Sequence, residues 1–80
     1  MGAVGAKRLP ETDGLLRDFG ARVREMRRQQ GLTQVELAEI SGLHRVTVAK
    51  IETGQLDVQL STVHRLAGGM GVPLSELLRS

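Results

Sequence analysis

Two small residues near the middle of the chain place the tightest constraint on how it folds. Ala38 and Gly42 are followed by Val48 and Ile51, which gives the spacing Ala-x3-Gly-x5-Val-x2-Ile. The small Ala38 lets two helices approach closely, and Gly42 is free to adopt a positive φ in the turn between them. Val48 and Ile51 then bury the second helix against the first. The spacing predicts two short helices joined by a tight turn that contains glycine.

Residues on either side of this turn set the ends of the two helices. Thr33 followed by Glu36 forms a capping box, which predicts a helix over residues 33–40. β-branched residues are frequent in the second segment and would suit a strand. Its short length and its apolar spacing favour a helix over residues 44–52 instead.

Three more helices are expected outside this pair. Apolar residues three or four positions apart predict a helix over residues 15–29, which Gly31 ends. Another helix begins at Leu60 or Ser61, and a short last helix begins at Pro73. The chain is therefore predicted to be all-α, with five helices.

The beginning of the chain differs from the rest. Residues 1–14 show no periodicity and hold three glycines and one proline, so we interpret them as a flexible arm. One domain then covers residues 15–80. The arm carries two basic residues, Lys7 and Arg8, which fit a disordered leader.

The composition excludes several classes of protein. The 80 residues allow one small domain, and they include no cysteine and a single aromatic residue, Phe19. Disulfides, cysteine-based zinc sites, thiol nucleophiles and aromatic stacking on single-stranded bases are excluded. No apolar run approaches the roughly 18 residues of a membrane span, and the N-terminus lacks the apolar segment of a secretory leader. We expect a cytoplasmic protein.

Catalysis is not expected. The two histidines, His44 and His64, lie 20 positions apart on different predicted helices. No metal-ligand spacing occurs, and the glycines of residues 68–71 lack the strand and the lysine of a phosphate-binding loop. We expect no enzyme, no metal and no cofactor.

Positive charge gathers in one segment. The net charge of +2 says little about partners, but Arg22, Arg24, Arg27 and Arg28 fall within seven residues. Without other evidence, a solvated helix face accounts for such a run better than a nucleic-acid contact does.

Several motifs, in order along the chain, resemble one family. They are Gly20 to Leu43, Val46 to Gly54, Leu60 to Ala67 and Gly71 to Leu78. These segments resemble the Cro/phage-repressor (Xre) family of DNA-binding domains over about residues 18–78. The resemblance implies a compact five-helix lambda-repressor-like domain with a helix-turn-helix. The helix over residues 44–52 would then lie in the DNA major groove, and the helix before it would cross the backbone.

The resemblance, together with helical periodicity, selects the residues that would read bases. Arg45 is expected to donate two hydrogen bonds to a guanine. Val46 and Ala49 would make apolar contacts, for example with a thymine methyl. Lys50 is expected to contact a phosphate. His44 either contacts DNA or simply occupies an exposed turn.

Contacts to the DNA backbone are expected from two further places. Thr33 and Gln34 begin the helix whose N-terminal amides favour a phosphate, although Gln34 also suits an exposed helix surface. Arg22 and Arg24 would reach flanking phosphates. The loop of residues 55–59 departs from the family because it carries no positive charge.

Arg27 and Glu52 are expected to form a structural ion pair, as such residues do in the family. The alternative is two separate solvated charges. A buried pair loses about 3–5 kcal/mol when one partner is removed, whereas an exposed pair is worth under about 1 kcal/mol.

Four apolar residues are candidates for a twofold dimer contact, because the family dimerises through this region; they are Leu56, Val58, Val72 and Leu74. Ordinary core packing explains them nearly as well, and Leu77 and Leu78 are expected in the core. A domain of this size buries only about 60–65% of its unfolded surface, so a partner copy would stabilise it.

The resulting functional hypothesis is a sequence-specific regulator that binds double-stranded DNA as a homodimer on a palindromic operator. A phage-type repressor and a restriction–modification controller both fit. The alternative is an antitoxin or adaptor module that mainly binds a protein, such as a toxin. Steep salt dependence of binding would distinguish DNA binding from protein binding.

Overall fold

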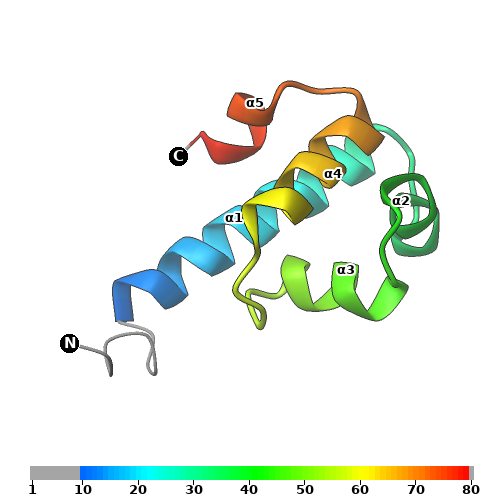
Figure 1. The fold of residues 1–80 in the computed structure, drawn as a ribbon. Coiled ribbons are helices and arrows are strands. Elements are labelled where there is room, and N and C mark those ends of the chain that lie inside the picture. The colour runs from blue at the N-terminus through cyan, green and yellow to red at the C-terminus, as the bar shows by residue number, and fades with distance from the viewer. Residues whose placement is uncertain (1–9, 80) are drawn as a thin grey trace.

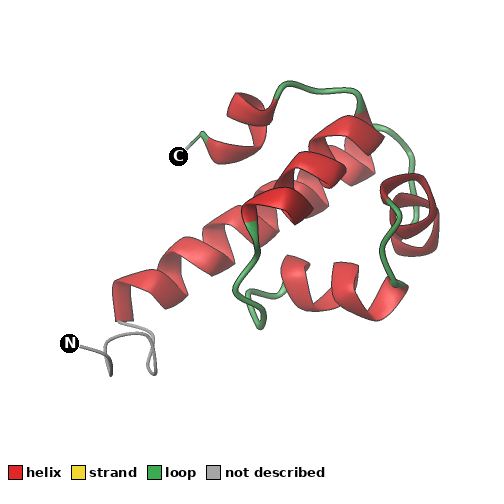
Figure 2. Cartoon of the chain, viewed as in Figure 1, coloured by secondary structure: helices red, strands yellow, loops and turns green. Residues whose placement is uncertain are grey.

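The computed structural model describes residues 10–79, which form five α-helices joined by short turns (Figures 1 and 2). The helices are α1 (Pro10–Gln29), α2 (Gln34–Ser41), α3 (Arg45–Glu52), α4 (Leu60–Met70) and α5 (Leu74–Leu78). No strand occurs among these described residues. The predicted all-α, five-helix architecture is confirmed. No helix in this part of the chain has both the length and the hydrophobicity needed to cross a bilayer.

The first helix begins earlier than predicted. It was expected from Leu15, but α1 starts at Pro10, so the assignment of residues 10–14 to a flexible arm is wrong. Proline is favoured in the first turn of a helix, and the acidic Glu11 and Asp13 interact well with the positive end of the helix dipole. These effects outweigh the weak helix propensity of a glycine. The rest of the predicted arm, with Lys7 and Arg8, lies outside the described residues.

The turn between α2 and α3 has the predicted geometry. Gly42 caps α2 with φ 69° and ψ 32°, the left-handed conformation that glycine adopts without steric cost. Its N–H donates to the carbonyls of Ala38 and Glu39, which satisfies the end of the helix. The chain therefore reverses sharply enough for α3 to pack on α2.

The core lies where all five helices meet. Its largest fully buried side chains are Val23, Leu37, Val48, Ile51, Leu66 and Leu77. α3 packs against α1 and α2, and α5 joins α4 to α1. Figure 1 shows α2 and α3 together at the end of the molecule away from the N-terminus.

The prediction for one apolar side chain is wrong, and the structure places four others. Leu78 was expected in the core but is 53% exposed, because the short α5 turns only one side inward. The four candidates for a dimer contact are half-buried and pack against the core; they are Leu56, Val58, Val72 and Leu74. Within one copy of the chain, these four residues serve the core.

A single glycine allows α1 to rest directly on α3. A Cβ atom added at Gly20 would lie 2.1 Å from the carbonyl oxygen of Ile51. Real side chains never approach backbone that closely, so any larger residue forces the two helices apart. Gly14, in the same helix, has no heavy atom within 4 Å of the equivalent position.

We expect Gly20→Ala to lower the free energy of unfolding by about 1–3 kcal/mol, because the added methyl overpacks the contact between α1 and α3. Gly14→Ala is the matched control and should raise stability by up to about 1 kcal/mol through helix propensity. Thermal unfolding followed by circular dichroism measures both. Equal effects of the two variants would contradict the close approach.

Candidate nucleic-acid interface

One side of α3 is left open to solvent. His44, Arg45, Val46 and Lys50 are exposed, and Ala49 is half-buried. The opposite side holds Val48 and Ile51, which are fully buried. The outward residues Arg45, Val46, Ala49 and Lys50 line a shallow surface hollow with Thr53 and Gln55. The residues predicted to read bases therefore lie together on one surface.

His44 precedes the helix and occupies its N-cap position. Its backbone is extended, with φ −84° and ψ 148°, and its side chain makes no capping hydrogen bond. The imidazole ring thus lies at the start of α3 and makes no capping hydrogen bond.

The start of α2 is fixed by a complete capping box. The Thr33 hydroxyl accepts from the Glu36 N–H at 3.0 Å, and the Thr33 N–H donates to the Glu36 carboxylate at 2.8 Å. These bonds hold the first turn rigidly. The next residue, Gln34, is half-buried, and its Nε2 donates to Oε1 of Glu52 at 3.1 Å. Gln34 thus contacts α3 directly and is not merely a solvent-exposed helix former.

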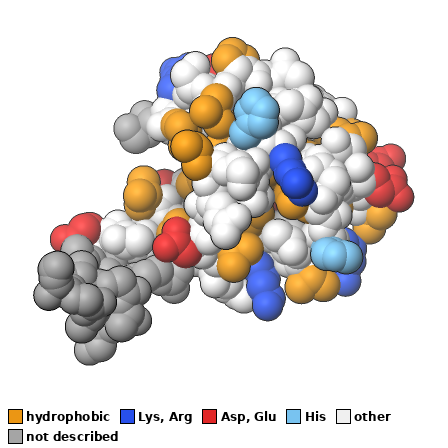
Figure 3. All heavy atoms as spheres, viewed as in Figure 1, with side chains coloured by type: hydrophobic (Ala, Val, Ile, Leu, Met, Phe, Trp, Pro, Cys, Tyr) orange, Lys and Arg blue, Asp and Glu red, His pale blue; other side chains and the backbone are white. Residues whose placement is uncertain are grey.

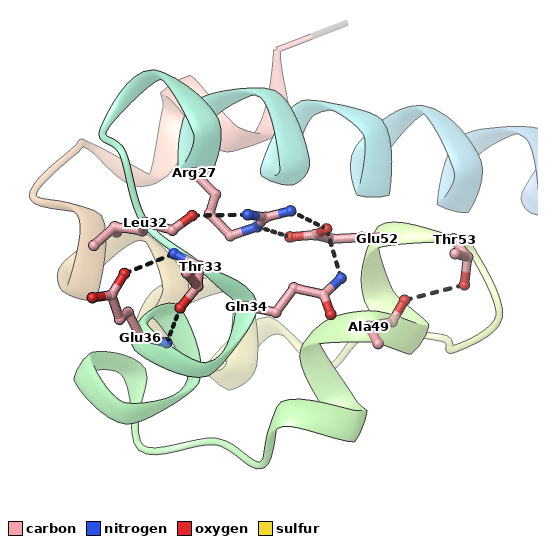
Figure 4. Close-up of polar contacts among 8 residues, drawn as sticks. All are labelled: Arg27, Leu32, Thr33, Gln34, Glu36, Ala49, Glu52 and Thr53. Carbon is pink, nitrogen blue, oxygen red and sulfur yellow. Dashed lines mark hydrogen bonds and ion pairs between the residues drawn. The ribbon is translucent and has the colours of Figure 1, made fainter.

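A buried ion pair joins α1 to α3 (Figure 4). Arg27 Nε donates to Glu52 Oε2 at 2.6 Å, and Arg27 Nη2 donates to Oε1 at 3.0 Å. Arg27 and Glu52 are only 8% and 6% exposed. The expected pair is therefore present, in the two-pronged geometry that gives arginine–carboxylate pairs their strength.

The same guanidinium also reaches the chain before α2. Arg27 Nη1 donates to the carbonyl of Leu32 at 2.8 Å. The hydrogen bond to Glu52 raises the pKa of Arg27, with a smaller Coulombic contribution, although burial acts to lower it. The side chain stays charged, and one polar network ties α1, α2 and α3 together.

The arginines of α1 divide between two sides of the helix. Arg24 lines a hollow with Glu52, at the end of α3. Arg22 lines hollows with α5, among them one shared with Leu77 and one with Glu76. The structure therefore brings Arg24 but not Arg22 beside α3.

Sequence reasoning did not single out Arg28, which lines the same hollow as Arg24. The signal was available, because residues four positions apart share one side of a helix. In the described part of the chain, no three His, Asp or Glu side chains gather as a metal site.

Comparison with known proteins shows the family. A model of the helix-turn-helix family (HTH_3) matches residues 23–77. The chain is 37% identical to the immunity repressor protein of Bacillus phage phi105 over 59 residues, which are 74% of this chain and 41% of that protein. It is 41% identical to the control protein C.SmaI of Serratia marcescens over 56 residues, 70% of this chain and 67% of that one.

A solved structure agrees with this match. The restriction–modification controller protein C.AhdI from Aeromonas hydrophila superposes with a TM-score of 0.76 and 41% identity, covering 80% of this chain and 96% of that one. The chain belongs to the Cro/phage-repressor (Xre) type of helix-turn-helix family. It spans less than half the length of the phi105 repressor.

We expect Arg27→Met to cost about 3–5 kcal/mol of stability, because it leaves the buried Glu52 carboxylate without its partner. Arg79→Met is the control, since Arg79 and Glu76 form an exposed pair at 3.1 Å. That substitution should cost under about 1 kcal/mol. Urea unfolding gives both free energies, and similar small losses would contradict the structural role of the buried pair.

Proposed function

We propose that the protein is a sequence-specific transcriptional regulator that binds double-stranded DNA and inserts α3 into the major groove. The observation that carries this proposal is the outward side of α3. There a guanidinium, an ammonium and two small apolar side chains stand on a helix locked in place by the Arg27–Glu52–Gln34 network. Membership of the family, and relatives named as a repressor and a control protein, support it.

The side chains of α3 divide the work by their chemistry. Arg45 makes no hydrogen bond or ion pair within the described chain, so its planar guanidinium is free to donate to guanine O6 and N7. Val46 and Ala49 offer apolar contact to a thymine methyl. Lys50 carries a compact charge suited to a phosphate. His44, at the start of the helix, lies within the same surface.

Backbone contacts are proposed from the start of α2. Thr33 and Gln34 lie at the positive end of that helix, which favours a phosphate. Gln34 is oriented by its bond to Glu52, so its position follows that of α3. Arg24 adds a contact from α1.

We further propose a homodimer that binds a palindromic operator. Two copies of α3 about 34 Å apart would enter successive major grooves on one side of the duplex. Exposed apolar side chains support a dimer contact, because a partner copy would cover them. Leu15 is 64% exposed, Leu60 66% and Leu78 53%. Figure 3 shows hydrophobic side chains gathered over α5 and the nearby part of α4. Leu15 and Leu78 line a hollow with Val58, one of the predicted contact residues.

A protein-binding module, such as an antitoxin or adaptor, is the second candidate. The observation that favours it is apolar exposure on α2 and α3, where Val35 is 47% exposed, Ile40 50% and Val46 53%. Such side chains suit a protein partner as well as a DNA groove. DNA binding predicts a steep loss of affinity with salt, and protein binding through this surface does not.

The proposed role needs neither a cofactor nor a catalytic group. As a regulator of transcription, the protein would act where the DNA lies, and we place it in the cytoplasm on that ground. Either a phage-type repressor or a restriction–modification controller satisfies this proposal.

Selection from a random duplex library at near-physiological salt tests the proposal directly. We expect a palindrome with a guanine in each half-site. Arg45→Ala should then weaken binding to the selected site by about 1–3 kcal/mol and relax the preference at one base pair per half-site. A uniform loss over all sequences would reduce Arg45 to a phosphate contact. No enrichment would favour the protein-binding candidate.

Lys50→Ala should behave differently, because a phosphate contact carries no sequence information. We expect affinity to fall by a similar factor on every duplex, and the log–log salt slope to decrease in magnitude by about 1 for each bound protomer. Fluorescence anisotropy on the selected duplex and on a scrambled one measures this. A loss confined to the selected duplex would make Lys50 a base reader.

A further inference from the structure

We infer, on the basis of the proposed function, that α1 carries a second phosphate-binding surface formed by Arg24 and Arg28. It would hold the sugar–phosphate backbone beside the groove that α3 enters. The remaining residues of the hollow that these two arginines line are Ala21, Glu25, Gln29 and Glu52.

The two arginines lie on the side of α1 that meets α3. They are four positions apart, so their side chains leave the helix in nearly the same direction. Gly20, where α1 touches the backbone of Ile51 and Glu52, is four residues before Arg24. Arg17, seven residues before Arg24, lies against Gly54, the second residue after α3: a Cβ at Gly54 would be 2.7 Å from Arg17 Cγ. The side of α1 that packs on the C-terminal end of α3 therefore carries several arginines.

This surface continues the proposed reading surface. Arg45, Ala49 and Glu52 are spaced four and three apart and share one stripe of α3. Glu52, at the end of that stripe, lines the hollow and also contacts Gln34 at the start of α2. A duplex that lies along the stripe would therefore have its backbone next to Arg24 and Arg28.

The charges in the hollow favour an anion. Glu52 is neutralised by Arg27, which leaves Glu25 as the one unpaired carboxylate among the lining residues. Neither Arg24 nor Arg28 makes an ion pair within residues 10–79. Two free guanidiniums against one carboxylate leave a net positive surface, and the planar guanidinium fork matches phosphate oxygens.

The spacing also suits a nucleic-acid strand. Four residues of helix rise by about 6 Å, so the two guanidinium groups leave α1 at separate points along a strand. Arg24 and Arg28 would contact neighbouring phosphates rather than one.

The test compares salt dependence among variants of the full chain. Fluorescence anisotropy measures binding to a random-sequence duplex at several NaCl concentrations. The duplex has about 30 base pairs, which is long enough for the protein to bind at several positions along it. The double variant Arg24→Gln/Arg28→Gln should reduce the magnitude of the log–log slope by about 2 for each bound protomer, one for each lost contact. Arg24→Lys/Arg28→Lys keeps both charges and should restore the slope.

Arg22→Gln is the matched control. It removes the same charge from the same helix, but on the side that faces α5, and should leave the slope unchanged. Circular dichroism melting confirms that each variant is folded.

The possible outcomes separate this inference from the proposed function. A wild-type slope in the double glutamine variant would overturn the second phosphate-binding surface while leaving α3 as the reading helix. The inference would also be overturned if Arg22→Gln reduced the salt slope as much as the substitution of Arg24 or Arg28 does. The loss of net charge alone would then explain the effect. If the wild-type chain bound no duplex at all, both the proposed function and this inference would be overturned.

Discussion

The buried ion pair between Arg27 and Glu52 fixes where α3 lies. An eight-residue helix is too short to be stable alone, so its position comes from its contacts. The pair supplies directional bonds from α1, and Gln34 adds one from α2 to the same carboxylate. Because both partners are buried, a shifted α3 would leave a charge without water or partner, and that cost restricts the helix to one orientation.

Close backbone packing complements this polar constraint. Gly20 lets α1 touch the end of α3, and Gly42 lets the chain reverse between α2 and α3. The ion pair needs this closeness, because a guanidinium bonds a carboxylate with two prongs only at hydrogen-bond distance. The outward side of α3 makes few contacts of its own, so its residues are free to serve recognition while inward residues maintain the fold.

Local signals predicted most of the fold, and long-range contacts set the rest. Thr33 and Glu36 predict the start of α2, because a capping box lies within four consecutive residues. The early start of α1 does not follow from the sequence pattern, because residues 1–14 show no apolar periodicity and hold three glycines, whereas Pro10 and two acidic residues support the first turn. The separation of Arg22 from Arg24 depends on where α5 packs, and the bond from Gln34 to Glu52 spans 18 positions. Neither follows from spacing alone, whereas the family resemblance did pair Arg27 with Glu52.

The central claim is that the outward side of α3, with the start of α2, meets DNA. Backbone amide chemical shifts measured by NMR during titration with a short duplex test it most directly. The account predicts that the largest shifts fall on residues 44–50 and on Thr33 and Gln34, with smaller shifts at Arg24 and Arg28. Shifts concentrated on α5 and the beginning of α4, with α3 unchanged, would contradict it.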